Sequence, residues 1–587
     1  YNSKDQRTGI LGQGWVTPAS MELVFEDNEL HFFGFQGRDL VFEDLQPGQQ
    51  RYFVEEGFQL IRSPGGFYYI NYPSMGLLYG FGKRSSVLNG ERLPLLFCQD
   101  EHENSINYDH DERGLLRTVT TSAGQRAVFH YSNDTPERTR LLHIEQIDTA
   151  SPLTLVRYRY SEEGDLIEVI DRLSNTQRRF EYQNHMMVRQ WFAIGLSCFY
   201  EWDEQSPEGR VIKHWTSDGE AYAFQYGNPN ESGQYEVHCV DHLGRTQHWI
   251  CNAEKLVTKY TNPIGAHFHL EWNANRHLLS HSLANGGVYR FAYDAIGKLT
   301  SIQDPLQRTA TMRWDDVRGK LVRFVNMDGS TWHCTYNEFG DLTEVQRPDG
   351  LSEHFVYDDK GLLVMFTDAK GGNKHYRYNE LAQTLSYTDC SGSTVAFAYD
   401  KWDQLARITN AKGESTEFTR NALGQVLQTR TADDATWQYQ YAAAGVLISS
   451  TDPYFRSTQW THNSRGQLVQ RSDAEQRQIH LVYDQAHRLA TLVNENGESF
   501  EFAYDIADRM VEERRVGGQR VSVEYDINGW PVSVTHHAGL GDDWLAAQSG
   551  GVTKGQTPEI VGWGDGNNAA QLNAADQPRR TGLIPDA

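Results

Sequence analysis

The chain has 587 residues, of which 12% are aromatic, and its 54 Lys and Arg residues against 78 Asp and Glu residues give a formal net charge of −24. This aromatic content favours strands and argues against a disordered chain, because disordered sequences are poor in aromatic residues. The acidic balance disfavours nucleic-acid binding by charge neutralisation, and no apolar run reaches the about 18 residues of a membrane-spanning helix, so neither a nucleic-acid partner nor a transmembrane segment is predicted.

The first half of the chain contains a loosely spaced series of aromatic residues. They follow one another at steps of 20 to 29 residues, at Tyr108, Tyr131, Tyr160, Tyr182, Trp202 and Tyr226. A looser form of the periodicity described next accounts for this series. We therefore assign residues 106–537 to one repeat array, of which residues 241–537 are the most regular part.

The second half of the chain repeats a 21-residue unit, with one step of 22 residues between Trp314 and Tyr336. Each unit has an anchor, an aromatic residue that is usually followed by Asp or Asn. The anchors are Trp272, Tyr293, Trp314, Tyr336, Tyr357, Tyr378, Tyr399, Tyr441, Tyr483, Tyr504 and Tyr525. Arg420 and His462 occupy two further registers of the same series. We expect the anchors to be structural residues of the repeat.

Each unit is predicted to form one β-hairpin. Residues at the anchor and at two and four positions before it share one face of a strand, as Phe500, Phe502 and Tyr504 do. The Asp-x-x-Gly that follows, as at Asp294 to Gly297, is turn chemistry, because Asp bonds to the backbone ahead of it and Gly adopts positive φ without steric cost. A second strand then runs to an Asp or Asn that begins the return turn. Consecutive hairpins should pair into a continuous antiparallel ribbon, so we predict an all-β fold.

The dimensions of such a ribbon predict its shape. About 56 strands at ~4.8 Å spacing would make a strip ~270 Å long and only ~20 Å wide. A flat strip would expose its aromatic rows and its edges, so the ribbon should coil, with successive turns of the coil meeting edge to edge. Since the chain has too few aliphatic residues for a solid core, we predict a hollow shell.

Residues 538–587 fall outside the repeat register and are rich in Gly and Ala. A loop, a linker and the start of a divergent C-terminal region are all open interpretations of this segment.

The search for chemical sites yields no catalytic, metal or cofactor site. Asp109 to Glu112, followed by Gly114, faintly resembles a calcium loop but lacks the closing Glu, so we interpret it as a turn. The doublet at His536 and His537 is interpreted as a solvated strand end. Six cysteines lie far apart without any Cys-x-x-Cys pair, at Cys98, Cys198, Cys239, Cys251, Cys334 and Cys390. The sequence therefore predicts no enzyme and no cofactor.

Particular segments resemble the YD repeat of the rearrangement hot-spot (Rhs) family, which includes bacterial polymorphic toxins, the C component of insecticidal toxin complexes and, more distantly, the teneurins. These segments are FAYDAIGKLTSIQDPLQRT from Phe291, YNEFGDLTEV from Tyr336 and YDDKGLLVMFTDAKGG from Tyr357. The opening YNSKDQRTGILGQGW, from Tyr1 to Trp15, resembles the family's first shell segment. On this resemblance residues 1–105 are the β-rich opening region of the shell.

The resemblance implies a hollow β-cocoon that encloses and delivers a C-terminal toxic domain. It implies synthesis in a bacterial cytoplasm, delivery to a target cell by a type VI secretion system with its spike, adaptor and chaperone partners, and an immunity protein. Family members cleave themselves at a DPxGLxGG-type motif, which this chain lacks: Asp304–Pro305 and Asp452–Pro453 continue as LQRT and YFRS. No catalytic residue is therefore carried over from the family.

Two other functions remain open from the sequence. The chain could be a cell-surface YD-repeat protein that recognises glycans or a protein partner, in which case several aromatic residues should gather in an outward groove. It could also be a structural wall without cargo. A container should instead use its aromatic face for packing within the wall.

Overall fold

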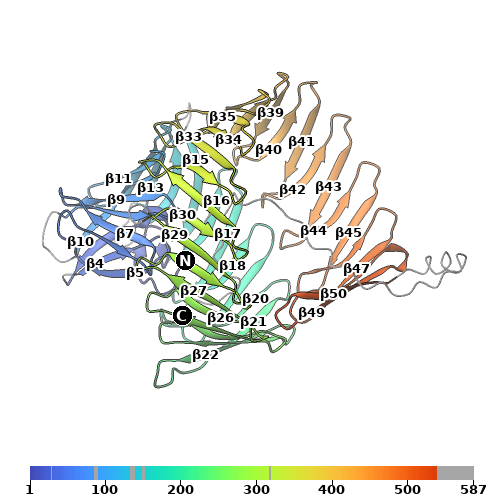
Figure 1. The fold of residues 1–587 in the computed structure, drawn as a ribbon, viewed down its shortest axis with the longest axis horizontal. Coiled ribbons are helices and arrows are strands. Elements are labelled where there is room, and N and C mark those ends of the chain that lie inside the picture. Colours follow the sequence, from blue (N-terminus) through green and yellow to red (C-terminus); the bar gives the residue numbers. More distant parts are fainter. Residues whose placement is uncertain (28, 85–89, 133–138, 149–151, 316–318, 538–587) are drawn as a thin grey trace, which may run out of the picture.

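The computed structural model describes residues 1–537 except residues 28, 85–89, 133–138, 149–151 and 316–318. The segment 538–587, for which the sequence left three interpretations open, lies outside the described residues. Strands and short turns make up nearly all of the described chain, which contains no α-helix, and 48 of its strands belong to one sheet. Within this part of the chain, no helix is both long enough and apolar enough to cross a membrane. The predicted all-β hairpin ribbon is confirmed, and Figure 1 shows it coiling.

The N-terminal part of the chain forms two packed layers. The layers contain β3 (Glu22–Glu26), β4 (Glu29–Phe33), β5 (Asp39–Glu43), β6 (Gln50–Phe53), β7 (Phe58–Arg62), β8 (Phe67–Tyr72), β9 (Leu77–Lys83) and β10 (Glu91–Asp100). Before them, β1 (Thr8–Gly9) and β2 (Gly12–Gln13) form a separate two-stranded sheet. The first half of β10 pairs with β3, and its second half pairs with β9 and β11. A dry core fills the space between the layers, where Leu23, Phe58 and Leu60 are fully buried.

From β10 onward, each strand pairs antiparallel with the next strand of the chain. The less regular strands are β11 (Ser105–His110), β12 (Leu116–Thr121), β13 (Arg126–Tyr131), β14 (Leu141–Gln146), β15 (Leu153–Tyr160), β16 (Leu166–Asp171), β17 (Thr176–Gln183), β18 (Met186–Phe192), β19 (Ser197–Trp202), β20 (Val211–Thr216), β21 (Ala221–Tyr226) and β22 (Tyr235–Asp241). Since β10 and β11 pair directly, the ribbon runs without interruption across residue 105.

The regular strands follow in the same pattern of short hairpins. They are β23 (Thr246–Cys251), β24 (Val257–Thr261), β25 (His267–Trp272), β26 (Leu278–Ser282), β27 (Val288–Tyr293), β28 (Leu299–Gln303), β29 (Thr309–Trp314), β30 (Leu321–Val325), β31 (Thr331–Tyr336), β32 (Leu342–Gln346), β33 (Ser352–Tyr357), β34 (Leu363–Thr367), β35 (Asn373–Tyr378), β36 (Thr384–Thr388), β37 (Thr394–Tyr399), β38 (Leu405–Thr409), β39 (Ser415–Arg420), β40 (Val426–Arg430), β41 (Thr436–Tyr441), β42 (Leu447–Thr451), β43 (Ser457–His462), β44 (Leu468–Ser472), β45 (Gln478–Tyr483), β46 (Leu489–Val493), β47 (Ser499–Tyr504), β48 (Met510–Arg514), β49 (Arg520–Tyr525) and β50 (Pro531–His537). Two short 3₁₀ turns complete the described elements, at Pro18–Ser20 and Val516–Gly518.

The turns at the two edges of the ribbon share one chemistry. After the anchor Tyr293, the Asp294 carboxylate accepts hydrogen bonds from the N–H groups of Ile296 and Lys298, at 3.0 and 2.9 Å. In the following return turn, the Asp304 carboxylate accepts from the residues two and four positions ahead in the same way, both at 2.9 Å. The fourth residue of each turn has positive φ, +83° at Gly297. Each edge is thus held by short-range bonds that the sequence dictates.

Candidate functional site: the anchors and the seam of the wall

The anchor residues link each hairpin to the one before it. Every anchor is half-buried on one face of the ribbon. The O–H or N–H at the tip of nine anchors donates to the backbone carbonyl 15 residues earlier, at distances of 2.7 to 3.0 Å: these are Trp272, Tyr293, Trp314, Tyr336, Tyr378, Tyr399, Tyr483, Tyr504 and Tyr525. Tyr357 and Tyr441 occupy the same strand position in β33 and β41.

The position of the carbonyl explains why the anchors are Tyr or Trp. The pairing register shifts beside each anchor, as between Ala292 and Tyr293, which marks a β-bulge. An aromatic body that ends in a donor can cover the ribbon and still satisfy a carbonyl of the preceding strand. Arg420 has no aromatic ring but keeps the bond, since its guanidinium donates to the Leu405 carbonyl at 3.2 Å. Nine anchors and Arg420 thus place a donor at the end of a long side chain against the carbonyl 15 residues earlier.

The loosely spaced half of the chain contains the same link. Tyr131, Trp202 and Tyr226 each donate to the backbone carbonyl 15 residues earlier, at 2.6, 2.9 and 3.0 Å. The irregular spacing of this half therefore reflects the lengths of its loops, while the hairpin-to-hairpin bond is retained. Sequence reasoning recognised these aromatic residues but not the carbonyls that they contact.

The coil brings the two edges of the ribbon together along a seam. In a hairpin ribbon the turns that follow the anchors lie on one edge, and the return turns lie on the other. Figure 1 shows the ribbon winding so that its last strands come back towards strands from the middle of the chain. Hydrogen bonds between residues 243 to 278 positions apart join the two edges: His102 to Lys360, Gln125 to Asp403, Arg172 to Ala422, Gln177 to Ala443, His242 to Gln485, Arg245 to Asp508 and Asn285 to Asn528.

Arg465 forms the most highly bonded contact of the seam. Its guanidinium hydrogen-bonds to both carboxylate oxygens of Asp218, one of them at 3.0 Å, and to the Glu220 carboxylate. These three side chains are only 20 to 21% exposed. Burial, the largest single influence, acts to raise the pKa of each carboxyl, but hydrogen bonds from Thr216, Tyr222 and Arg465 outweigh it and lower both pKa values. Both acids are thus held ionised and paired across the seam.

The N-terminal segment packs against the first turn of the coil. The Trp15 indole N–H donates to the Tyr182 hydroxyl at 3.0 Å, and the Tyr1 hydroxyl donates to the His185 carbonyl at 2.6 Å. The Ile10 carbonyl accepts from the backbone N–H of Leu141 at 2.8 Å. Residues 1–15 therefore contact parts of the ribbon that lie more than 100 residues later in the chain.

The structure shows what each chemical candidate found in the sequence contacts. The Asp111 carboxylate accepts N–H groups of its own turn, from Arg113 and Leu115 at 2.9 and 3.0 Å. His537 contacts the Ser522 hydroxyl at 3.2 Å on β49. All six cysteines are free thiols. None of these contacts assembles a reactive group.

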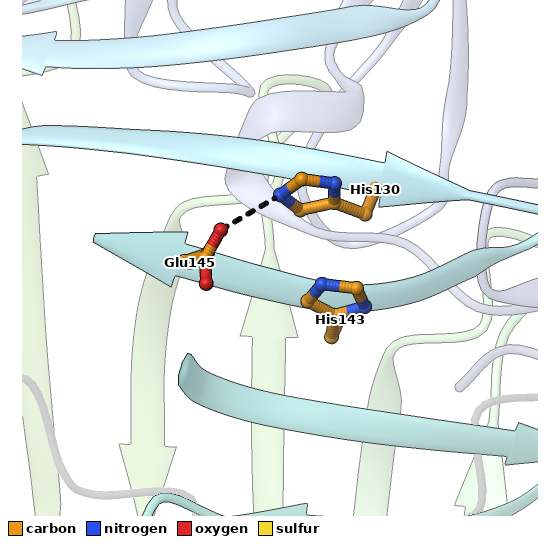
Figure 2. Close-up of side chains that lie close together, drawn as sticks. All are labelled: His130, His143 and Glu145. Atoms are coloured by element: carbon orange, nitrogen blue, oxygen red, sulfur yellow. Dashed lines mark ion pairs between the residues drawn. The ribbon is translucent and has the colours of Figure 1, made fainter. Parts of the chain in front are cut away.

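Within the part of the chain that the structure describes, two groups of metal-ligating side chains come together, and sequence reasoning did not single them out. One comprises His130, His143 and Glu145, which lie on two neighbouring strands (Figure 2). The other comprises Glu236, His238 and His248. In each group two members share one strand and the third lies on the neighbouring strand, so the pairing register places them side by side.

Comparison with known proteins gives one family for most of the described chain. The sequence profile of the teneurin YD-shell family matches residues 95–239 and 284–434, and a domain of unknown function matches residues 1–42. Double-stranded DNA deaminase toxin A of Burkholderia cenocepacia is 30% identical over 255 residues, which are 43% of this chain and 17% of that protein. Toxin protein Tse5 of Pseudomonas aeruginosa is 28% identical over 421 residues, which are 61% of this chain and 30% of that protein.

One further relative is similar in sequence, and two solved structures share the fold. Probable deoxyribonuclease RhsB of Dickeya dadantii is 25% identical over 345 residues, covering 57% of this chain and 21% of that protein. The crystal structures of TcdB2-TccC3-TEV and TcdB2-TccC3-Cdc42 share the fold, with TM-scores of 0.54 and 0.53 at 14% and 13% identity, and each match covers 77% of this chain and 27% of the other. The chain thus spans 17 to 30% of the length of these curated relatives.

Proposed function

The chain belongs to the YD-shell family, which includes the Rhs proteins, and from this premise we propose that residues 1–537 are wall of a container that encloses and delivers a toxic C-terminal domain of the same protein. The observation that carries the proposal is the seam. Edges 243 to 278 residues apart are joined turn to turn, so that a narrow ribbon becomes a broad wall.

The aromatic residues support a container rather than a glycan-binding surface. Rings on neighbouring strands contact one another along the wall, with centroids 5.2 Å apart for Phe355 and Phe366 and 5.3 Å apart for Tyr376 and Tyr387. The anchor tips are also engaged by backbone carbonyls. Because the wall itself uses these rings, we propose that the anchors are structural and that this part of the protein acts without catalysis of its own.

The finer features of delivery are also proposals. A toxin separated from the producing cell by a wall needs an export route, and we propose a type VI secretion apparatus with its spike and adaptor proteins. Synthesis in a bacterial cytoplasm, delivery into a target cell and a cognate immunity protein complete this proposal. Its support is the resemblance to Rhs toxins and the similarity to proteins named as toxins.

A growth assay tests the container. Bacteria would express residues 1–537, the full-length gene, or the region that follows the shell alone. We expect residues 1–537 to be harmless and toxicity to map to the later region. Toxicity of residues 1–537 would refute the proposal, because it would require an active centre in the wall.

Protease protection of the full-length product tests enclosure directly. We expect the C-terminal region to survive protease while the wall is intact, and to be cleaved faster in an Arg465→Ala, Arg245→Ala double variant that weakens the seam. Arg430→Ala is the matched control, because Arg430 pairs with Glu417 across a single hairpin. Equal cleavage of all three proteins would argue against a closed wall.

A further inference from the structure

One arrangement of side chains occurs twice in the wall. In the first copy, His130 on β13 lies directly opposite His143 on β14, and Glu145 follows two residues later on β14 and so shares the same face. The two imidazoles are stacked, with centroids 4.2 Å apart and planes inclined by 8°. The His130 Nε2 lies 3.3 Å from a Glu145 carboxylate oxygen. A dashed line marks this ion pair in Figure 2.

The second copy has the same construction on β22 and β23. His238 lies directly opposite His248, with ring centroids 4.0 Å apart and planes inclined by 12°. Glu236 stands two residues before His238 on the same strand. The Nε2 atoms of His238 and His248 lie 3.4 and 3.3 Å from the same oxygen of Glu236. Two nitrogens and one oxygen therefore converge on one point.

One imidazole nitrogen in each copy lacks a hydrogen bond, although in the second copy the His238 Nε2 is hydrogen-bonded to Glu236 at 3.4 Å. The Nε2 atoms of His130 and His248 are shielded from solvent and have no hydrogen-bond partner. Each lies within ion-pair distance of its carboxylate, but the geometry is not that of a hydrogen bond. A shielded nitrogen without a partner is unfavourable unless another group satisfies it, and a neutral imidazole nitrogen is a strong ligand for metal ions.

Among the charged groups around the first copy, the Glu145 carboxylate favours a bound cation and the Arg157 guanidinium opposes one. Arg157 on β15 lies opposite His143, but its guanidinium donates to the Thr154 hydroxyl at 3.3 Å. The chain as a whole carries a formal charge of −24, which favours cations.

We propose that each of these two clusters binds one divalent transition-metal ion of the zinc class, with two imidazole nitrogens and one carboxylate oxygen as ligands. In each cluster the three ligand atoms lie within 4.8 Å of one another. Zinc–nitrogen bonds of about 2.0–2.1 Å require the atoms to approach further, which rotation of the stacked rings about their side-chain bonds can supply. The nitrogen ligands favour Zn²⁺, Cu²⁺ or Ni²⁺ over Mg²⁺ or Ca²⁺, and three protein ligands leave a position open for water. This inference does not depend on the container function.

Titration of the untagged, chelator-treated chain with Zn²⁺ in a calorimeter tests the proposal. We expect two ions per chain and an unfolding midpoint that rises with Zn²⁺ concentration. His143→Gln and His248→Gln should each remove one ion or weaken its binding at least about tenfold, and the double variant should bind neither. These side chains are only half-buried or less, so the variants should fold, which circular dichroism would check.

His333→Gln is the matched control, because His333 is an exposed histidine on β31 whose cross-strand neighbours are Arg323 and Gln346. It should bind two ions, as the unchanged chain does. X-ray absorption should show nitrogen ligands at about 2.0–2.1 Å. The absence of saturable binding, a single bound ion, or two ions that survive both substitutions would overturn the proposal. The clusters would then be stacked histidine pairs beside a carboxylate.

Discussion

The N-terminal layers and the repeat wall use the same element, a short antiparallel strand, but are stabilised differently. In the layers, Leu23, Leu30, Phe58 and Leu60 are 0% exposed. In the wall, the anchors and most of their neighbours are half-buried. Among the described residues after Cys251, the only buried apolar side chains are those of Ala266, Ala310, Leu362 and Val521.

This difference shows that a strand can be held in place without a dry core. In the N-terminal layers, burial of apolar area supplies the stabilisation, and each side chain is closely surrounded. In the wall, turn carboxylates, anchor hydroxyls and seam ion pairs each contribute a small amount, repeated many times. Single substitutions should therefore cost more in the layers than in the wall.

Leu60→Ala should give the largest effect, because Leu60 is fully buried in the core between the layers. Removing its side chain leaves a cavity and should lower the unfolding free energy by about 2–5 kcal/mol. The measurement is the unfolding midpoint by circular dichroism. Leu363→Ala on β34 is the wall counterpart, and its half-buried side chain should cost clearly less. Equal losses of unfolding free energy in the two variants would contradict the difference drawn between the N-terminal layers and the wall.

Arg465→Ala should have the next largest effect. The substitution leaves Asp218 and Glu220 as partly buried carboxylates without their cation, and should cost about 1.5–3 kcal/mol. The control is Arg430→Ala, which removes an exposed ion pair and should cost less than about 1 kcal/mol. Comparable losses in the two variants would show that the seam contributes no more than a surface pair.

Lowering the pH should destabilise the folded protein for the same reason as the loss of Arg465, because it removes the ion pairs of Asp218 and Glu220. The folded protein lowers the pKa values of Asp218 and Glu220, so their stabilisation is fully present above the unfolded pKa values of about 4. It is lost as the pH falls through the lower folded values. The unfolding midpoint should therefore fall less steeply below about pH 4 in Arg465→Ala than in the unchanged chain. Parallel curves would place the acid sensitivity elsewhere.

Tyr504→Phe should have a smaller effect, since it keeps the ring and removes only the hydrogen bond to the Leu489 carbonyl, which is 2.8 Å long. The expected loss is about 0.5–1.5 kcal/mol, measured by denaturant unfolding. Tyr454→Phe is the control, because that ring is 79% exposed, and it should change nothing measurable. If Tyr504→Phe also leaves the free energy of unfolding unchanged, the anchors stabilise the protein through their rings alone.

The hairpins were predictable from the sequence because their determinants are local. An Asp and a residue with positive φ three positions later define each turn, and alternation defines each strand. The seam was not predictable, because its partners, such as Arg245 and Asp508, meet only after the twist of many strands has accumulated. The pair of His130 and His143 was missed for another reason: a register shift beside Tyr131 decides which residues lie opposite one another.

Phe455→Gly should give the smallest effect, with the opposite sign. Phe455 is the fourth residue of the return turn that begins at Asp452, a position where many other turns have Gly, and its φ is +62°. A left-handed conformation costs an ordinary residue about 1–2 kcal/mol, and the ring, which is 89% exposed, regains little of this by burial. The greater flexibility of Gly in the unfolded chain offsets part of the gain, by about 0.5–1 kcal/mol. The variant should therefore be more stable by up to about 1 kcal/mol.

Gly392→Ala makes the reverse change, from Gly to a residue with a side chain, at the same position of another turn. It therefore tests the cost of the backbone conformation alone. Gly392 has φ of +84°, and an added Cβ would meet no atom within 4 Å, so neither a clash nor new burial contributes. The substitution should destabilise the wall by about 1 kcal/mol, because only the backbone conformation changes in cost. Measured side by side by denaturant unfolding, the two variants should move the midpoint in opposite directions. If Phe455→Gly instead lowers the midpoint, the aromatic ring must stabilise the wall despite its exposure, and its contacts then outweigh the strain of the turn backbone at this edge.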